Sequence, residues 1–271
     1  MWSPIPTTRW TSLRPDALPR FSANIGLLWP DRALLERLEA AANAGFRAIE
    51  MHFPYDVAPR DVGSLARQKN LTLLGINTHP GRADLGERGL GALPGRERDF
   101  AATVAESIDY CVASGATAIH AMAGNEDYGR GRPVFLNNLA AAAALAAAHR
   151  LTLLLEPLNP RDNPGYFYSR VDQAVSLIEE LGQPNLKLQF DVYHVAVTEG
   201  DVLRKLEKYL PVIGNVQIAG VPSRAEPDEG EIAYPAVLAH LDRLGYAGWV
   251  GAEYRPRAAT DAGLAWMKTL T

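Results

Sequence analysis

The sequence predicts a single α/β domain, a (β/α)8 barrel in which eight parallel strands close into a ring. From Phe21 onward, short apolar runs alternate with segments of helical periodicity, as in successive strand–helix units. Eight units account for nearly all of the 271 residues, and a single barrel typically needs about 250. The alternative is a doubly wound open sheet. The sequence has neither a GxGxxG after the first strand nor a GxxxxGK[ST], the usual motifs of such nucleotide-binding sheets.

Eight apolar runs are the candidate strands. The run FRAIEMH follows Ala44-Gly45, a helix-stop signal, and ATAIHAM follows a second one at Gly115. The other runs are short and apolar, as expected of strands that are buried on both faces of the sheet. In chain order, the expected strands are 21–28, 46–52, 71–77, 116–122, 151–156, 186–191, 213–218 and 248–253.

Helical periodicity occupies most of the intervals. The first helix opens at Pro30-Asp31, and its apolar residues from Leu34 to Ala41 are spaced along one face. The glycine-rich stretch 124–131 predicts a flexible loop rather than a phosphate cradle. Residues 1–20 are expected to be an N-terminal extension over one end of the barrel, which comprises 21–271. Further helical patterns lie at 97–114, 135–149, 170–181, 201–210, 232–245 and 260–270.

Composition and charge argue against several classes of protein. The 27 Lys and Arg nearly balance 31 Asp and Glu, and a net charge of −4 gives no support to nucleic-acid binding. The single cysteine, Cys111, excludes an intrachain disulfide framework. The first fifteen residues lack a signal-peptide core, and the apolar run Leu139–Ala148 is shorter than the ~20 residues of a membrane span. We therefore expect a cytoplasmic protein without a nucleic-acid or membrane partner.

Each of the last four expected strands carries, at or near its end, a polar residue whose side-chain oxygen can bind a metal ion. These residues are Glu156, Asp191, Gln217 and Glu253. A single carboxylate at such a position is often only a helix cap. Four of them on consecutive strands would converge on one rim of a closed barrel, where carboxylates repel one another unless a cation intervenes. Three carboxylates and an amide oxygen suit Mg²⁺ or Mn²⁺, so the sequence predicts a divalent metal site.

Other polar residues near the strand ends are candidate substrate contacts. Asn77 and His120 end the third and fourth expected strands, and His194 lies three residues beyond Asp191. Arg224, in the loop after the seventh strand, could hold an anionic substrate with two hydrogen bonds. A structural histidine and a solvated loop arginine are the alternatives. Residues at similar positions on the first strands are Asn24, Glu50, His52 and His79.

This set of groups predicts proton transfer next to a carbonyl. A divalent ion bound to a carbonyl and an adjacent hydroxyl acidifies the neighbouring C–H and stabilises an enediolate. Glu156 and Glu253, on different strands, could remove and return the proton from two sides. The sequence contains no Gly-x-Ser-x-Gly elbow and no motif of an organic cofactor, so neither covalent nor redox chemistry is indicated.

At these residues the sequence resembles the hydroxypyruvate isomerase family, within the xylose-isomerase-like TIM barrels. The likeness extends from Phe21 to Trp266. Its landmarks, in order, are RFSANIGLL, GFRAIEMHFPYD, GERGLGALPGRE, LLLEPLN, LKLQFDVYH, VQIAGVPSRAEPDEGEIAY, YAGWVGAEYRP and AGLAWM. The exit of the third strand, INTHPGRADLGERG, and the loop around Ala225 and Asp228 depart from the family's pattern, which leaves the substrate open.

The resemblance implies an aldose–ketose isomerase that interconverts hydroxypyruvate and 2-hydroxy-3-oxopropanoate (tartronate semialdehyde). It implies Glu156 and Glu253 as the proton donor and acceptor, and His194 and Arg224 as substrate contacts. The implied metal ligands are Glu156, Asp191, Gln217 and Glu253. Relatives with this name also act on other short sugar acids such as 2-oxo-tetronate, and related barrels are sugar 3-epimerases. Homo-oligomers are common among such barrels.

Two readings outside the isomerases remain. An endonuclease of the endonuclease IV type relies on a histidine-rich multi-zinc cluster and a DNA-gripping surface, whereas this chain has six histidines, Gln217 at a ligand position and a negative net charge. A barrel that binds a sugar acid without turning it over is the non-enzymatic alternative. The retention of both Glu156 and Glu253 argues against it.

Overall fold

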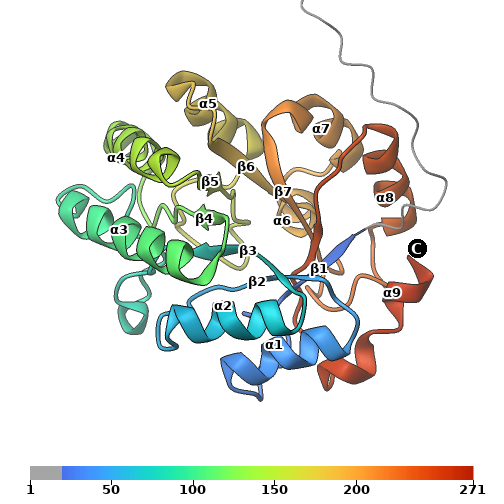
Figure 1. The fold of residues 1–271 in the computed structure, drawn as a ribbon. Coiled ribbons are helices and arrows are strands. Elements are labelled where there is room, and N and C mark those ends of the chain that lie inside the picture. The colour runs from blue at the N-terminus through green and yellow to red at the C-terminus, as the bar shows by residue number, and fades with distance from the viewer. Residues whose placement is uncertain (1–19, 271) are drawn as a thin grey trace, which may run out of the picture.

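The computed structural model describes residues 20–270, and these form a closed barrel of eight parallel strands in sequential order (Figure 1). The barrel closes where β8 pairs with β1, through the register Phe21–Val250 and Ala23–Ala252. The strands are β1 Phe21–Asn24, β2 Ala48–Glu50, β3 Thr72–Asn77, β4 Ala118–His120, β5 Thr152–Leu155, β6 Leu186–Asp191, β7 Ile213–Ile218 and β8 Val250–Ala252. The predicted fold class is therefore confirmed.

Helices surround the barrel on the outside (Figure 1). The α-helices are α1 Leu34–Asn43, α2 Pro59–Gln68, α3 Glu97–Ser114, α4 Tyr128–Ala148, α5 Val171–Leu181, α6 Val192–Thr198, α7 Val202–Tyr209, α8 Tyr234–Arg243 and α9 Trp266–Thr269. Short 3-10 helices lie at Ala83–Leu85, Leu210–Val212 and Thr260–Gly263. Within residues 20–270, no helix combines the length and apolar character needed to cross a membrane.

The expected helices differ from the observed ones in several places. Helix α2 was not predicted, because PRDVGSLARQ is polar on average, although Val62 and Ala66, four residues apart, do mark a buried helical face. The last expected helix, 260–270, is a 3-10 turn followed by the four residues of α9. The expected strands are two to four residues too long in several cases, and the predicted extension 1–20 lies outside the described residues except for Arg20.

The stretch 124–131 is a further correction, because its second half belongs to α4 and not to a loop. The side chain of Asp127 accepts a hydrogen bond from the amide of Arg130, 3.1 Å away, and so caps the helix. A Cβ at Gly131 would lie 2.8 Å from the carbonyl oxygen of Ala92. Gly131 therefore permits a close approach between two backbone segments. The glycines of this stretch do not make it a flexible loop.

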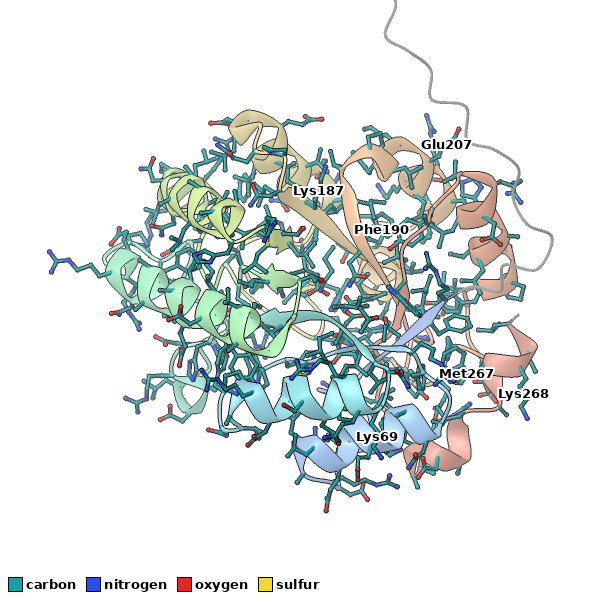
Figure 2. The ribbon with its side chains drawn as sticks, viewed as in Figure 1. Lys69, Lys187, Phe190, Glu207, Met267 and Lys268 are labelled. Atoms are coloured by element: carbon teal, nitrogen blue, oxygen red, sulfur yellow. The ribbon has the colours of Figure 1, made fainter. Side chains whose placement is uncertain are left out.

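The apolar core lies between the strands and the helices (Figure 2). Phe190 of β6 is fully buried, while Gln189 and Asp191 on either side of it point the opposite way, into the barrel, because strand side chains alternate. Each helix buries one face against this layer. Examples are Leu38 of α1, Phe100 of α3, Leu139 of α4, Ile178 of α5 and Leu241 of α8.

The inside of the barrel is unusually polar and incompletely filled. Gly75 and Ala118 face each other across β3 and β4, and these small residues leave space at the axis. A cavity of about 240 Å³ remains there. Its polar lining includes Glu50, Gln189 and Gln217. The polar interior leads directly to the carboxyl ends of the strands.

Candidate active site at the carboxyl ends of the strands

The structure brings together, at one end of the barrel, the four residues predicted to bind a metal ion. These residues, all buried, are Glu156, Asp191, Gln217 and Glu253. Asp191 is the last residue of β6 and Gln217 lies opposite it on β7. Glu156 and Glu253 directly follow β5 and β8. Because parallel strands all end at the same edge, residues far apart in sequence meet there.

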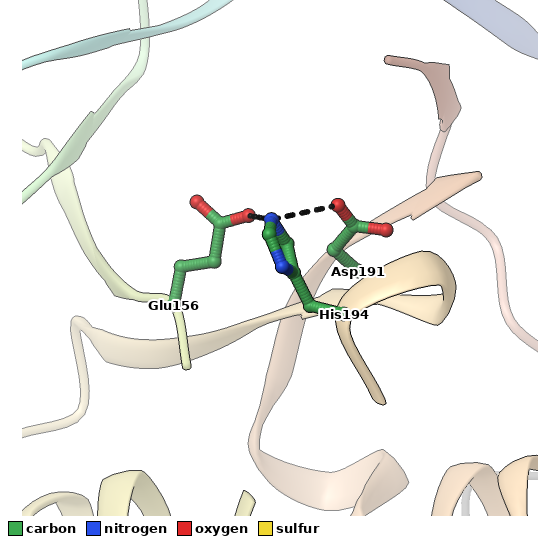
Figure 3. Close-up of side chains that lie close together, drawn as sticks. All are labelled: Glu156, Asp191 and His194. Atoms are coloured by element: carbon green, nitrogen blue, oxygen red, sulfur yellow. Dashed lines mark ion pairs between the residues drawn. The ribbon is translucent and has the colours of Figure 1, made fainter. Parts of the chain in front are cut away.

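Glu156, Asp191 and His194 form the centre of the site (Figure 3). The Nε2 atom of His194 lies 3.9 Å from Oε1 of Glu156 and 3.6 Å from Oδ2 of Asp191. The other oxygen of each carboxylate is occupied. Oε2 of Glu156 accepts from Nε2 of Gln189 at 2.7 Å, and Oδ1 of Asp191 accepts from the amide of Tyr193 at 2.8 Å. Asp191 is thus a helix cap for α6 and a member of the site at once.

His194 presents an N–H to this centre. Its Nδ1 accepts from the backbone amide of Asn159 at 3.0 Å, so that nitrogen carries no proton. Burial, reinforced by the charge of Arg224, lowers the pKa of His194 to about 3, so the ring is neutral with its proton on Nε2. Glu156, Asp191 and His194 each offer an atom within 4.8 Å of the others, a group that could hold a metal ion. A protonated Nε2 does not ligate a cation, so the tautomer favours a substrate contact for His194.

Arg224 reaches the carboxylates from the loop after β7. Its Nη2 lies 2.7 Å from Oε1 of Glu253 and 3.9 Å from Oδ2 of Asp191. The guanidinium packs over the ring of Tyr193 at 5.2 Å. Its backbone is left-handed, with φ 57°, a conformation unusual for arginine. Arg224 therefore supplies part of the positive charge that offsets the buried carboxylates, beside that of any bound metal ion.

Burial and neighbouring charges push the pKa values of the carboxyl groups apart. Burial raises the pKa of Glu156 well above its ordinary 4.5, and the charges of Glu253 and Asp191 raise it further. Burial likewise raises the pKa of Asp191 to about 7. Burial also opposes ionisation of Glu253, but its contacts with His52 and the charge of Arg224 outweigh burial and lower the pKa to about 2. The two glutamates of one rim are therefore shifted in opposite directions, Glu156 toward the protonated form and Glu253 toward the ionised form.

The donor set fits a hard divalent cation. Oε1 of Glu156, Oδ2 of Asp191 and Oε1 of Gln217 are buried oxygens without a hydrogen-bond partner. Buried polar atoms are rarely left unpaired without a ligand or water. Both oxygens of Glu253 are engaged, one by Arg224 and the other by Asn24 at 2.9 Å. The first three residues are thus ready to ligate, while Glu253 would join them by exchanging a partner.

The two remaining predicted contacts lie on neighbouring strands. His120 and Asn77 face each other in the register of β3 and β4, and both line the barrel cavity. Nδ1 of His120 is 3.3 Å from Oε2 of Glu156. Burial lowers the pKa of His120 to about 4, so this ring is neutral, and neither of its nitrogens has a hydrogen-bond partner. His120 adjoins the carboxylate centre, and Asn77 contributes to the floor beneath it.

Sequence reasoning did not assign roles to several residues that contact the glutamates. Asn24 donates to Glu253, Gln189 donates to Glu156, and Nε2 of His52 lies 3.6 Å from Oε1 of Glu253. The signal for Gln189 was available, because it stands two residues before Asp191 and therefore on the same face of β6. The contacts of Asn24 and His52 depend on closure of the barrel between β1 and β8, which no local pattern reveals.

The pH dependence of stability offers a test of this electrostatic arrangement. The folded pKa of Asp191, about 7, lies above its ordinary 3.8, so the native state holds this proton more tightly than the unfolded chain. The stabilisation is complete below about pH 4 and is lost as the pH rises through 7. We expect the unfolding midpoint of chelator-treated protein to fall over this range, and to fall less steeply in Asp191→Asn. Equal slopes in calorimetric melts of the two proteins would contradict the assignment.

Comparisons with known proteins place the chain in a family. It is 48% identical over 255 residues to the 2-oxo-tetronate isomerase of Cupriavidus necator, covering 93% of this chain and 98% of that protein. It is 40% identical over 261 residues to the putative hydroxypyruvate isomerase of Homo sapiens, covering 92% and 94% of the two chains.

A solved structure named AP endonuclease, family 2, from Brucella melitensis superimposes with a TM-score of 0.90 at 41% identity. That likeness covers 93% of this chain and 98% of that one. Residues 38–270 match the family described as xylose isomerase-like TIM barrel. Together with the closed eight-stranded sheet and the rim of buried oxygen donors, this match shows that the chain belongs to the xylose isomerase-like TIM barrel family.

Proposed function

We propose that this chain is an aldose–ketose isomerase of a short hydroxy-oxo acid, interconverting hydroxypyruvate and 2-hydroxy-3-oxopropanoate. The observation that carries the proposal is the pair Glu156 and Glu253. Both glutamates are buried at the same end of the barrel, and their pKa values are shifted in opposite directions. Two glutamates that differ in proton affinity can remove a proton on one side of a bound substrate and return one on the other, which isomerisation through an enediolate requires.

Glu253, ionised beside Arg224, takes the proton from C3 of hydroxypyruvate. The hydroxyl proton on O3 passes to O2, which moves the negative charge to O3, and Glu156 then delivers a proton to C2 as the C3 aldehyde forms. The two glutamates return to their starting states by exchanging protons with solvent. The Nε2–H of His194 donates to a substrate oxygen between them, and the unpartnered Nε–H of Arg224 holds the substrate carboxylate. A divalent cation such as Mg²⁺ or Mn²⁺, held by Glu156, Asp191, Gln217 and Glu253, would polarise the carbonyl and stabilise the enediolate charge. The reaction requires no organic cofactor.

The four-carbon acid 2-oxo-tetronate is the second candidate substrate. It is favoured by the 48% identity to the 2-oxo-tetronate isomerase of Cupriavidus necator. Both candidates share the carboxylate, the adjacent carbonyl and the neighbouring hydroxyl that the site would bind. They differ beyond C3, where the longer acid places one more hydroxylated carbon. A neutral ketose, the substrate of a sugar 3-epimerase, would leave the Arg224 donor without its carboxylate partner.

The decisive experiment follows proton exchange in deuterated water. The purified protein, with Mn²⁺ or Mg²⁺, should convert hydroxypyruvate or 2-oxo-tetronate to its isomer and incorporate solvent deuterium at the carbon that receives the proton. The ratio of the two kcat/KM values then identifies the better substrate. A panel of short oxo-acids without turnover, together with binding of an unreactive analogue, would instead indicate a sugar-acid-binding barrel. Because the Brucella structure is named an AP endonuclease, cleavage of abasic DNA should also be assayed. Such cleavage would overturn the proposal.

Replacing Arg224 with lysine should lower activity more than replacing Arg161 with lysine. Arg224→Lys removes the Nε–H and the planar fork, and we expect kcat/KM to fall about 10–100-fold, mainly through KM. Arg161→Lys is the matched control, since Arg161 contacts the same Tyr193 through its hydroxyl but sits half-exposed beside Asp162. Its initial rates should change by less than about threefold. Similar losses in the two variants would remove Arg224 from its proposed role.

A further inference from the structure

A buried carboxyl group lies inside the barrel, below the proposed metal ligands. Glu50, the last residue of β2, has a side chain enclosed by three donors. Oε1 accepts from the hydroxyl of Ser22 on β1 at 2.7 Å. Oε2 accepts from Nδ2 of Asn215 at 3.0 Å and from Nε2 of Gln217 at 2.7 Å, both on β7. β2 and β7 are not neighbours in the barrel, since β1 and β8 lie between them.

The chemistry of these contacts determines which way the Gln217 amide faces. A carboxylate oxygen only accepts, so Gln217 must turn its NH₂ toward Glu50 and its carbonyl oxygen away. Protonation of Glu50 would not change this, because the proton can sit on Oε1 and bond to the hydroxyl of Ser22. The carbonyl oxygen of Gln217, turned away from Glu50, is buried and has no hydrogen-bond partner. It stands next to Asp191 in the strand register.

The barrel wall makes room for this contact. A Cβ at Gly251, on β8, would lie 2.3 Å from Oε1 of Glu50 and 2.9 Å from Cγ of Gln217. Only glycine at this place lets the two side chains pass β8 and meet. Glu50 is the acceptor for three buried donors, so its carboxyl group links Ser22 on β1 to Asn215 and Gln217 on β7 through the inside of the barrel.

We propose that Glu50 is a positioning residue: it holds the Gln217 amide with its carbonyl oxygen presented to the divalent cation. This inference rests on the proposed metal site, and it assigns a role to the polar interior of the barrel. Groups that orient a metal ligand by hydrogen bonding typically change metal affinity by about 10–100-fold when they are removed. Glu50 would act on the cation only through Gln217.

The test is Mn²⁺ affinity of the metal-free protein, measured by calorimetry and by the electron paramagnetic resonance signal of free Mn²⁺. Glu50→Leu should weaken binding about 10–100-fold. Glu50→Gln should retain affinity to within about threefold, because its amide oxygen can still accept from Gln217 while its NH₂ faces the Ser22 hydroxyl. Ser22→Ala is the control, since it removes one bond to Glu50 and leaves the Gln217 contact.

A double-mutant cycle separates positioning from a general structural role. In a Gln217→Ala background, Glu50→Leu should cause no further loss of Mn²⁺ affinity, because its target is gone. An equal loss with and without Gln217 would overturn the proposal, as would full affinity in Glu50→Leu. Wild-type protein that binds no Mn²⁺ would instead overturn the metal site itself. If Glu50→Leu does not fold, Glu50→Asp replaces it: the acceptor retracts by about 1.5 Å, and unchanged Mn²⁺ affinity would equally contradict the proposal.

Discussion

Glu156→Gln and Glu253→Gln are each expected to lower kcat by about 10²–10⁴-fold, since an amide neither accepts nor donates the transferred proton at neutral pH. The effects of the two substitutions on stability should have opposite signs. Glu156 is held in a site where burial and two carboxylates oppose its ionisation, so an uncharged amide should stabilise the fold above neutral pH. Glu253 accepts from Arg224, and its replacement leaves a nearly buried guanidinium with a weaker partner.

The measurement combines initial rates with thermal unfolding at pH 8 in the presence of a chelator. We expect Glu253→Gln to lose about 1–3 kcal/mol of unfolding free energy, as for other hydrogen bonds to charged groups, and Glu156→Gln to gain stability. The double variant should be no less active than either single one, because either loss already removes proton transfer. Retained activity in one variant would show that this glutamate is not the acid–base group. Equal shifts in unfolding would contradict the separation of the two pKa values.

Removal of the divalent cation should have the second-largest effect. We expect chelation to lower kcat/KM by at least about 100-fold, because the carbonyl then lacks its strongest polarising group, and Mn²⁺ or Mg²⁺ should restore it. Asp191→Asn should prevent this restoration at ordinary Mn²⁺ concentrations, since its unpartnered oxygen carries charge to the proposed ligand set. Affinity should also rise between pH 6 and 8, as Asp191, with a pKa of about 7, loses its proton.

Asp162→Asn is the matched control for Asp191→Asn. Asp162 lies near the same site, but its carboxylate is already bound, accepting from the Tyr193 hydroxyl at 2.6 Å and from Asn159 at 3.2 Å. Its Mn²⁺ affinity should stay within about threefold of the wild type. A chelated protein that turns over at the full rate, with no ion detectable by elemental analysis, would exclude the cation from the mechanism.

Much of the fold could be predicted because its signals are local. Each strand is a short apolar run, and the helix stops at Gly45 and Gly115 mark where two of them begin. Helix α2 was not predicted because its sequence is polar on average, so its narrow apolar face of Val62 and Ala66 is a weak signal. Helix α6 was not predicted for a different reason, since it is only seven residues long and its apolar sequence follows Asp191, the last residue of β6, with no loop between them. Only the capping hydrogen bond of Asp191 marks the change.

The candidate site was predictable in its residue types and only partly in its contacts. Glu156, Asp191, Gln217 and Glu253 could be selected because strand ends share one rim in any closed parallel barrel. The sequence could not predict which of their oxygens lack a hydrogen-bond partner. That depends on Gln189, Asn24 and Arg224, which lie on other strands and loops.

The sequence by itself determined the barrel and the rim of polar oxygens, because strand period and chain order place these residues whatever their neighbours are. Only the tertiary structure decided their surroundings: burial raises the pKa of Glu156, contacts with His52 and Arg224 lower that of Glu253 despite its burial, Nδ1 of His194 accepts from the Asn159 amide, and the Gln217 amide donates to Glu50. The reason is physical. Protonation and orientation depend on burial and on charges within a few ångströms, and in a closed barrel those neighbours come from strands distant in the chain.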